Sequence, residues 1–552
     1  MAEFYNPYHF VPVTGDNSTS DILKEQLPFS SHIRHDRYCT ETVIGKASQP
    51  VFSGRMICRL TTEDPVVIGK KRHQDDDNDP STVDPFQLEN GDPIIPGSTS
   101  RGLISSIAET ASNSALRVLE DKPYSFRGAD RKRHPAGTAW EYFTGFSQEK
   151  LPMNKTRKRV SLAEQLFGFV ELNTEESKDT ESNIPALAGR LRFSMAEVVP
   201  KSDKKYFSEK TLLKILDSPK PPQPAFYFKN KNGTTNKAIP VGSLTSQQHV
   251  PQGRKFYLHR QDGDNEPWKT DPARNSEDDR KQKTWVTPLD EGVSFYFHID
   301  FDNLSEMELS LLCYALRPTD DFRHKLGMGK SLGLGKVLID PVGFFLIDRL
   351  ARYEQTNLFA ASRYDKAWIK DGEDFSKWPD YRYRREIKEQ ATVKKDGSYF
   401  ESLREGFTAQ MDQDIRLALE LLGDPSKVDK PVRTPQIANP SHEETETFRW
   451  FVDNAKKKGG AQYLVPLNQT DGKLHPLSNK WSSGVAHQPA SNAGNRAASR
   501  QDTIRHRPSR PALQQQSPLS NQSNEMYGLD DLLNKYSQAN NKGKKKKRDG
   551  NK

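Results

Sequence analysis

The sequence has few cysteines and no long apolar run. Only Cys39, Cys58 and Cys313 occur among the 552 residues, and none belongs to a C-x-x-C pair. This spacing favours neither a zinc site nor a disulfide framework, and it fits a reducing compartment. The longest late apolar stretch, at 342–347, is far too short to span a bilayer, and the N-terminus lacks the basic start and apolar segment of a signal peptide. We therefore expect a cytoplasmic protein without membrane contact.

Hydrophobic residues are also scarce, and the excess of charge is concentrated at one end. They make up 34% of the chain, and the mean hydropathy of −0.84 is low for a compact enzyme, so we expect much loop or disorder. The formal net charge is +8, but the last twelve residues alone carry +6, from six lysines and one arginine against one aspartate. A nucleic-acid site in the remainder must therefore be a local basic patch.

The two common phosphate-binding motifs are absent, although residues 324–337 (HKLGMGKSLGLGKV) resemble both. The Walker pattern requires a glycine where His324 stands, and the spacing of Gly327, Gly329 and Gly333 misses the dinucleotide pattern by one residue. A strand-like VLID follows, where the dinucleotide fold needs a helix. The loop therefore needs another explanation.

Hydrophobic periodicity predicts an α+β fold. Met56, Cys58 and Leu60 alternate as in a strand, and Ser305 and Glu308 have the spacing of a capping box at the start of a helix over 304–318. Six elements follow in the order β-α-β-β-α-β, which is the ferredoxin-like or RRM-like split unit. They are a strand beginning near 54, a helix within 93–120 with apolar positions Leu103, Ile104, Ile107, Ala108, Ala111 and Ala115, strands at 188–199 and 291–301, the helix at 304–318, and a strand at 337–347.

Composition divides the chain into three parts. Residues 1–350 form the predicted core, interrupted by a Lys-, Pro- and Asn-rich insertion at about 200–284. Residues 351–466 are predicted to be a mainly helical extension, and 467–552 a disordered, basic-ended tail, because Ser, Asn, Gln and Pro dominate there without periodicity.

Four stretches together resemble one family. They are FYNPYHFVPV at 4–13, the pair GDPIIPGSTSRGLISSIAE and AEQLFG, the strand AGRLRFS at 188–194, and the glycine-rich loop. In combination they resemble the RAMP superfamily of CRISPR-associated proteins, and more narrowly the RNA-binding backbone subunits of type III effector complexes. The resemblance covers about 1–350 without the insertion. It implies guide RNA, target RNA and other effector subunits as partners in antiviral defence.

The resemblance makes the glycine loop and the start of the first helix candidate RNA-binding segments. Glycines let backbone N–H groups approach phosphate, lysines add charge without selecting a base, and a helix N-terminus offers unpaired donors. The alternatives are a flexible glycine hairpin and ordinary helix capping. The candidate residues are Gly97, Ser98, Ser100, Arg101, Lys325, Gly327, Gly329, Lys330, Gly333, Gly335 and Lys336.

The resemblance also implies an endoribonuclease residue. Backbone subunits of the family carry a target-cutting aspartate in the loop after the first strand, and Asp84 in TVDPF lies at the matching place. Asp84 could hold a divalent cation, Mg²⁺ or Mn²⁺, or orient the attacking ribose 2′-hydroxyl. Here proline follows the aspartate directly and Asp75, Asp76, Asp77 and Asp79 lie nearby, a run that is typical of a solvated loop.

Two other functions stay open. One is a structural RAMP subunit that binds RNA without cutting it. The other is a guide-processing nuclease that uses His32, His35 or His73 as general acid or base. Aromatic and basic residues also alternate at 204–207, 225–231 and 253–260, where they could stack bases or form the apolar face of a hairpin.

Overall fold

The computed structural model describes most of the chain between residues 3 and 478. Its gaps are 16–26, 29–40, 45–46, 122, 128–132, 155–156, 158, 171–185, 204, 217–223, 233–238, 261–265, 271–281, 348–365, 375, 377, 379–392, 395–397, 435–441, 458–460 and 471. The expected basic tail from 479 onward, His32 and His35 lie outside the described residues.

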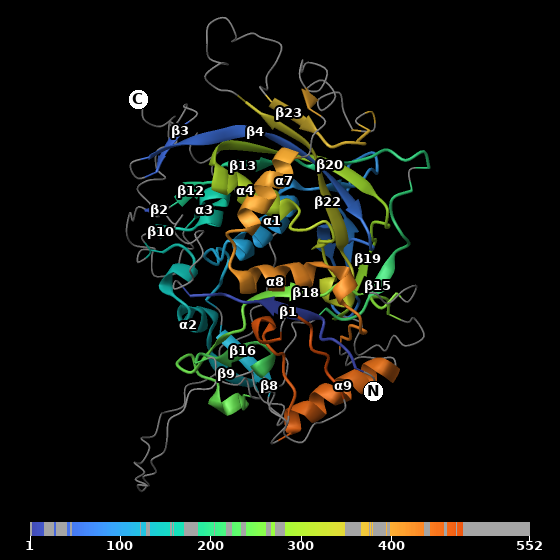
Figure 1. Cartoon of the computed structure of the whole chain (residues 1–552). Helices are drawn as coiled ribbons and strands as arrows, with labels where there is room; N and C mark the ends of the chain where they lie inside the picture. The colour runs from blue at the N-terminus through green and yellow to red at the C-terminus, as the bar shows by residue number, and fades with distance from the viewer. Residues whose placement is uncertain are drawn as a thin grey trace, which may run out of the picture. The chain divides into compact units, whose positions relative to one another are not determined.

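A curled sheet organises the described part of the chain (Figure 1). Its three long strands lie in the order β22 (Lys336–Leu346), β4 (Ala47–Thr62), β20 (Ser294–Ser305), and both pairings are antiparallel. Short strands extend this set on either side to ten strands. They are β24 (Val393–Lys394) and β23 (Lys366–Ile369) beyond β22, β14 (Ala196–Val198) and β7 (Ile94–Ile95) beyond β20, and the laterally paired β13 (Leu191–Phe193), β21 (His324–Lys325) and β3 (Glu41–Ile44).

Helices cover one face of this sheet. These are α1 (Gly97–Ala111), α4 (Glu306–Leu316) and α7 (Ser398–Thr408). Met56, Cys58 and Leu60 all point into the core under these helices and are fully buried, so the predicted alternation is confirmed. Ile57, between them, is buried on the opposite face in a second cluster with Trp378.

The predicted start of α4 is confirmed. The Ser305 hydroxyl accepts a hydrogen bond from the Glu308 N–H at 3.3 Å, and the Glu308 carboxylate accepts one from the Ser305 N–H at 2.8 Å. This capping box satisfies two backbone donors that the helix leaves unpaired. Because β20 ends at Ser305 and α4 begins at Glu306, the cap fixes the turn from sheet to helix.

The fold is therefore α+β with a curled antiparallel sheet, as expected at that level. The expected elements occur along the chain in the order β4, α1, β13–β14, β20, α4, β22. Helix α1 ends at Ala111, and Ala115 is buried beyond its end. The finer assignment to the ferredoxin-like fold and the three-part division stay predictions.

A second layer lies below the sheet in Figure 1. Strand β1 (Tyr8–Val11) pairs antiparallel with β18 (Arg254–Tyr257), so the N-terminal segment joins the segment expected to be an insertion. Helix α8 (Gln413–Gly423) lies between this pair and α1. The remaining elements are α2 (Ala139–Thr144), α3 (Leu162–Phe167), α9 (His442–Lys456), and the strand pairs β8 (Pro123–Arg127) with β9 (Arg133–Thr138), β16 (Phe228–Asn230) with β17 (His249–Pro251), β10 (Arg159–Val160) with β2 (Leu27–Pro28), and β11 (Gly168–Val170) with β12 (Ala186–Ala188).

The two ends of the described part of the chain meet in this layer. Phe4 and Leu477 exchange two backbone hydrogen bonds, of 3.0 and 2.8 Å. The Phe4 ring packs edge-on against Trp450 of α9 at 5.2 Å between centroids. Leu477, in the segment expected to be a disordered tail, thus packs against the N-terminal segment.

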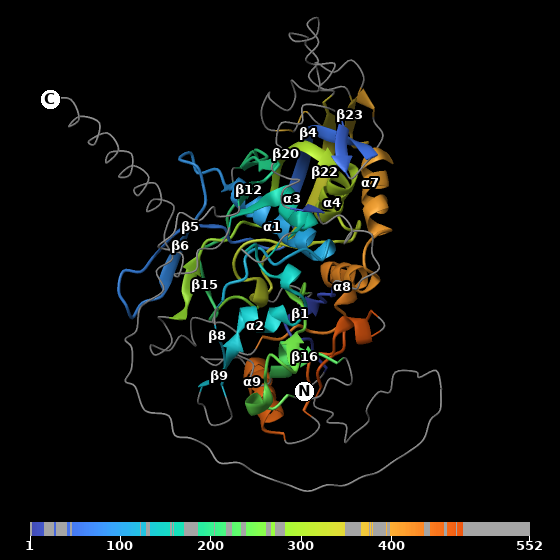
Figure 2. The same ribbon diagram turned by 90° about the vertical axis from the view of Figure 1, so that its left-hand side faces the viewer.

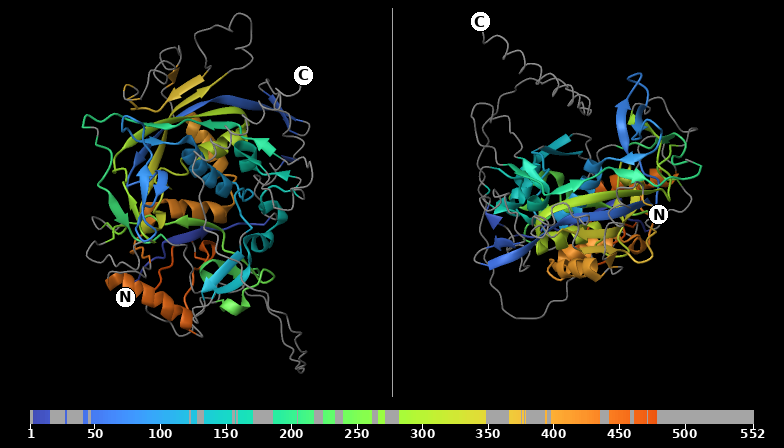
Figure 3. Two further views of the ribbon diagram at one scale, coloured as in Figure 1. Left: turned by 180° about the vertical axis from the view of Figure 1, so that it is seen from behind. Right: turned by 90° about the horizontal axis from the view of Figure 1, so that it is seen from above.

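A hairpin stands apart from the main sheet. It consists of β5 (Gly69–His73) and β6 (Ser81–Pro85), and β6 pairs with β19 (Thr284–Val286), which in turn pairs with β15 (Thr211–Leu213). Figure 2 shows the hairpin projecting sideways, and the view from above in Figure 3 shows the same projection. Every residue of β5 is exposed.

Candidate nucleic-acid interface

The glycine loop is tightly packed. Gly327 and Gly335 have φ of +83° and +92°, and a Cβ added at these positions would lie 2.3 Å from the Val67 carbonyl oxygen and 2.1 Å from the Leu326 carbonyl oxygen. The loop is also bonded to the start of the hairpin, because the Met328 N–H donates to Val67 O at 2.9 Å. A flexible hairpin does not describe this loop.

One corner of the loop has the geometry of an anion site. Gly329 is left-handed, with φ of +72°, and begins a short 3₁₀ turn over Lys330–Leu332. The backbone N–H groups of Gly329, Lys330 and Ser331 have no acceptor among the described residues. Successive unpaired N–H groups beside a left-handed residue form a concave anion site, or nest.

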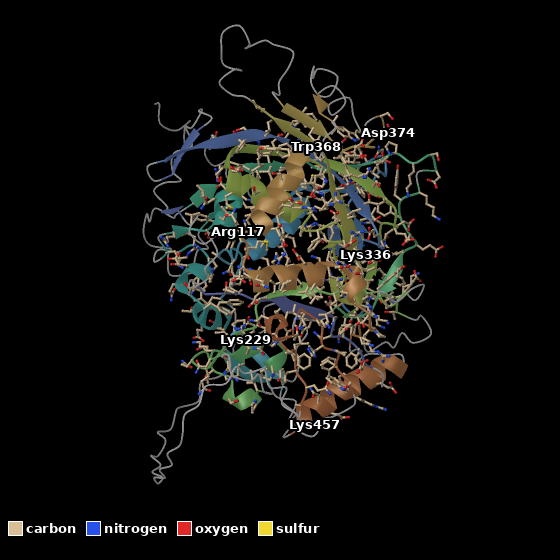
Figure 4. All side chains as sticks on the ribbon, in the orientation of Figure 1. Arg117, Lys229, Lys336, Trp368, Asp374 and Lys457 are labelled. Carbon is tan, nitrogen blue, oxygen red and sulfur yellow. The ribbon has the colours of Figure 1, made fainter. Side chains whose placement is uncertain are left out.

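The three lysines of the loop have different surroundings. Lys325 Nζ donates to the carbonyl oxygens of Gly333 at 2.9 Å and Leu334 at 3.2 Å, and burial lowers its pKa to about 7. Lys336, labelled in Figure 4, pairs with Asp64 at 3.2 Å. These two lysines hold the loop in place.

Lys330 is the loop cation that remains available. It has no ion-pair partner among the described residues, and burial lowers its pKa. It lies at the corner where the unpaired N–H groups gather.

The N-terminus of α1 lacks a side-chain cap. Pro96 is the N-cap residue and cannot supply one, and the first turn holds no acidic residue. Ser98 and Ser100 make no capping bond; Ser100 is instead buried, and its Oγ has no partner among the described residues. The N–H groups of Thr99 and Ser100 donate to the Pro96 carbonyl, whereas those of Gly97 and Ser98 have no acceptor among the described residues. The helix dipole and these two N–H groups can therefore attract an anion.

The other two candidate residues at this end of α1 support packing. A Cβ at Gly97 would lie 2.4 Å from the Phe193 carbonyl oxygen, so only glycine lets the helix start so close to β13. The Arg101 guanidinium donates to the Phe167 carbonyl and lies 6.0 Å from the Phe167 ring centroid. Arg101 is thus turned toward α3.

A cavity of about 790 Å³ connects the two candidate segments, and it is lined by Ser98 and Thr99 of α1, Gly327 and Lys330 of the loop, and Lys255 and Tyr257 of β18. This volume lies within the usual range for ligand pockets, about 300 to 1,000 Å³. We name it the α1–loop cavity.

Positive charge exceeds negative charge in this cavity. Two lining arginines have carboxylate partners: Arg254 pairs with Glu109 at 3.5 Å, and Arg323 pairs with Glu63 at 2.7 Å. Lys255 has no carboxylate partner among the described residues. Its ammonium nitrogen lies 4.1, 4.9 and 5.6 Å from the ring centroids of Tyr8, Tyr257 and Tyr227, and burial lowers its pKa to about 8.

Two lining histidines were not singled out by the sequence. His259 and His324 are 1% and 2% exposed, and their Nε2 atoms each lie 3.0 Å from a backbone carbonyl oxygen, of Arg323 and Leu316 respectively. Both Nδ1 atoms lack a partner among the described residues. The only sequence signal was their position beside basic and aromatic residues, in GRKFYLHR and in the glycine loop.

Asp84 lies elsewhere, on the hairpin. It is the fourth residue of β6, its side chain is 47% exposed, and its Oδ2 lies 3.5 Å from Nδ1 of His73 on β5. Lys70, Lys71 and Arg72 precede His73 on the same exposed strand. The structure thus brings Asp84 together with His73, one of the three candidate histidines, and with a basic strand. The acidic residues Asp75, Asp76, Asp77 and Asp79 lie at the exposed end of the same hairpin.

The residues around Asp84 do not fit a resident metal centre. No group of three or more His, Cys, Asp or Glu side chains able to hold a metal ion occurs in the described part of the chain. Asp84 and His73 together supply one carboxylate and one imidazole. We therefore derive no chemical step through Mg²⁺ or Mn²⁺.

The AEQLFG motif supports the first helix from the side. The Arg157 guanidinium donates to both Glu164 carboxylate oxygens, at 2.7 and 2.9 Å, and these two side chains are 1% and 0% exposed. Glu164 also accepts from the Ser161 N–H and hydroxyl, which completes a capping box for α3. Gly168 ends that helix with φ of +69°.

A family comparison agrees with the motifs. The family model described as the RAMP superfamily matches residues 59–337, which is just over half of the chain and includes the hairpin, α1, α4 and the glycine loop. The chain belongs to the RAMP superfamily. RAMP proteins are CRISPR-associated, and they generally bind CRISPR RNA and other effector subunits.

No curated protein matches this RAMP chain. Among its described helices, none has the length and apolar character needed to cross a membrane.

Proposed function

We propose that this RAMP protein is a subunit of a type III CRISPR effector complex and binds guide RNA at the α1–loop cavity. One observation carries the proposal: Ser98 and Thr99 at the uncapped start of α1 and Lys330 of the glycine loop line one cavity together with Lys255, and neither lysine has a carboxylate partner among the described residues. Such donors suit a polyanion whose sequence is not being selected.

The strand order supports a ferredoxin-like core for this function. The neighbours β22, β4, β20 and β14 pair antiparallel throughout, and α1 and α4 follow the strands β4 and β20. This is the arrangement that the β-α-β-β-α-β unit requires. The type III assignment itself rests on the resemblance of the motifs.

We further propose that the hairpin cuts target RNA through Asp84. The basic strand Lys70–Arg72 attracts the target backbone, and Asp84 accepts the proton of a ribose 2′-hydroxyl as that oxygen attacks the adjacent phosphorus. The bond from phosphorus to the 5′-oxygen breaks, water protonates the leaving oxygen, and a 2′,3′-cyclic phosphate remains. His73 orients the carboxylate.

The RNA-binding proposal is tested by a salt series. Lys330→Ala should weaken guide-RNA binding and lower the slope of log affinity against log salt by about one, because one phosphate contact is lost. Lys473→Ala, an exposed lysine outside the cavity, is the matched control and should change neither quantity. An unchanged slope for Lys330→Ala would refute RNA contact at the loop.

The cleavage proposal is tested with assembled complex, guide-complementary RNA and either Mg²⁺ or Mn²⁺. Asp84→Asn should reduce the cleavage rate by about a hundredfold or more at unchanged target affinity, because a proton acceptor acts in the transition state. Asp77→Asn, at the exposed end of the same hairpin, controls for charge. If the wild-type complex leaves the target intact, the alternative of a non-catalytic structural subunit holds.

A further inference from the structure

Lys255 of β18 is surrounded by aromatic rings alone. Its ammonium nitrogen lies 4.1, 5.6 and 4.9 Å from the ring centroids of Tyr8, Tyr227 and Tyr257, and it has no carboxylate partner and no hydrogen bond among the described residues. Burial raises the pKa of all three tyrosines, so their hydroxyls carry no charge at neutral pH. Lys255 therefore has no negative neighbour in this cage to hold its proton.

The amine of Lys255 is consequently a better nucleophile than that of an ordinary lysine. Burial lowers its pKa to about 8. About one chain in ten therefore carries the neutral amine at pH 7, against about one in 2,500 for an exposed lysine. The neutral amine is the form that attacks a carbonyl carbon. Lys255 also lines the α1–loop cavity and is partly exposed, so a small reagent can reach it.

Geometry distinguishes Lys255 from a second lysine of the cavity. Lys325 lines the same cavity, and burial lowers its pKa to about 7. Its Nζ, however, donates to the carbonyl oxygens of Gly333 and Leu334, at 2.9 and 3.2 Å. A substituent on that nitrogen would disturb these hydrogen bonds. The nitrogen of Lys255 has no such bond to lose among the described residues.

The positive charge of the cavity selects the kind of reagent. Lys330 lines the cavity without a carboxylate partner among the described residues, and Ser98 and Thr99 bring the uncapped start of α1 to the same wall. Unpaired cations in a concave site raise the local concentration of anions, and a helix N-terminus favours them further. A small acyl donor that carries a phosphate suits this cavity better than a neutral one.

We propose that Lys255 is an acylation site that reacts directly with a small acyl phosphate. The neutral Nζ attacks the carbonyl carbon, a C–N bond forms, and the C–O bond to phosphate breaks. Phosphate leaves with the electron pair, and the nitrogen loses its extra proton to water, so no oxidant or reductant is required. The product is a neutral amide, which removes the cost of burying an unpaired charge among three rings.

Acylation would also regulate the site, and this consequence rests on the proposed function. The amide no longer carries the positive charge that Lys255 offers to a phosphate of RNA. RNA affinity should therefore fall in the acylated protein.

The test measures acylation lysine by lysine on the folded, full-length wild-type chain. The protein is incubated at pH 8 with acetyl phosphate, and peptide mass spectrometry follows the acetylated fraction of each lysine over time. Lys210 is the matched control, because it also lies over an aromatic ring, 5.6 Å from the Trp285 centroid, but is exposed and outside the cavity. A parallel series with acetyl coenzyme A separates the two donors.

We expect Lys255 to be acetylated about tenfold faster than Lys210. Its neutral fraction at pH 8 is about a hundredfold larger, and its lower basicity and its burial offset part of that gain. Lys255 should also react faster than Lys325, and added inorganic phosphate should slow the reaction at Lys255 but not at Lys210.

Three results would overturn the proposal. The first is a rate at Lys255 no greater than that at Lys210. The second is a faster reaction at Lys325, which would mean that an unbonded nitrogen does not decide the site. The third is modification of Lys255 by acetyl coenzyme A alone, which would exclude the acyl phosphate as donor.

Failure of this inference is distinguishable from failure of the proposed function. Lys255→Gln, which resembles the amide, should bind RNA about tenfold more weakly than Lys255→Arg, which keeps the charge. If either variant does not fold, acetylated and untreated wild-type protein give the same comparison. Equal RNA affinities would overturn the regulatory consequence while the acetylation rates still decide the site. A wild-type chain that binds no RNA would overturn the proposed function and leave those rates as the test of acylation.

Discussion

The buried pair Arg157–Glu164 should be one of the most sensitive points of the fold. Burial alone would lower the pKa of the Arg157 guanidinium, but the hydrogen bonds and charge of Glu164 raise it overall. Glu164→Ala leaves that buried guanidinium with Glu149 alone, whose Oε2 lies 3.5 Å from Nε, and it removes the cap at Ser161. Removing one partner of a buried pair costs about 3 to 5 kcal/mol. We expect a loss of this size in the free energy of unfolding.

Urea unfolding followed by tryptophan fluorescence measures this loss. Glu89→Ala, an exposed glutamate, is the control and should change the free energy of unfolding by less than about 0.5 kcal/mol. The double variant Arg157→Met/Glu164→Leu should cost clearly less than the two single variants added together, because neither member of the fully buried pair is left without the other. A loss below about 1 kcal/mol in the free energy of unfolding of Glu164→Ala would refute the stabilising role of the buried pair. Lost RNA affinity in a fully folded Glu164→Ala variant would instead indicate that the AEQLFG motif contacts RNA directly.

Three further predictions concern the loop and the cavity. Gly335→Ala should lower the free energy of unfolding more than Gly91→Ala, as urea titration would show. Both glycines have a positive φ, which strains an alanine by about 1 to 2 kcal/mol. Only at Gly335 would the new Cβ also clash with a carbonyl oxygen, that of Leu326 at 2.1 Å. Burial lowers the pKa of Lys325 from 10.5 to about 7, so the folded state binds fewer protons than the unfolded state between these values and the free energy of unfolding rises with pH there. Lys325→Met should remove up to about 1.4 kcal/mol per pH unit of that slope, and a slope identical to wild type would contradict the burial of the ammonium. With a Lys255 pKa of about 8, RNA affinity should fall as pH rises from about 7 to about 9 in the wild type but not in Lys255→Met, as fluorescence polarisation would show.

Local patterns predicted the elements of the sheet and its helices. The alternation at Met56, Cys58 and Leu60 requires only that successive side chains of a strand face opposite sides. The capping box at Ser305 and Glu308 spans four residues of chain. Such signals depend on neighbouring residues and need no knowledge of the fold.

The cavity could not be predicted in the same way, because its walls come from distant parts of the chain. Phe10 lies beside Lys255 only through the pairing of β1 with β18, across a segment that appeared to be an insertion. His259 gave no periodic or motif signal. The glycine loop was recognised, yet the packing of Gly335 on a carbonyl and the pairing of Lys336 with Asp64 depend on contacts that no spacing shows.

The bridge between Phe4 and Leu477 has a consequence for synthesis. A ribosome releases the chain from its N-terminus, so Phe4 emerges long before its partner, and β1 likewise waits for residues 254–257. The aromatic surface of Phe4 that later packs on Trp450 stays open to other partners throughout that interval. Because the α1–loop cavity is lined by residues as late in the chain as Gly423, we expect nascent chains that have not passed residue 423 to lack this cavity.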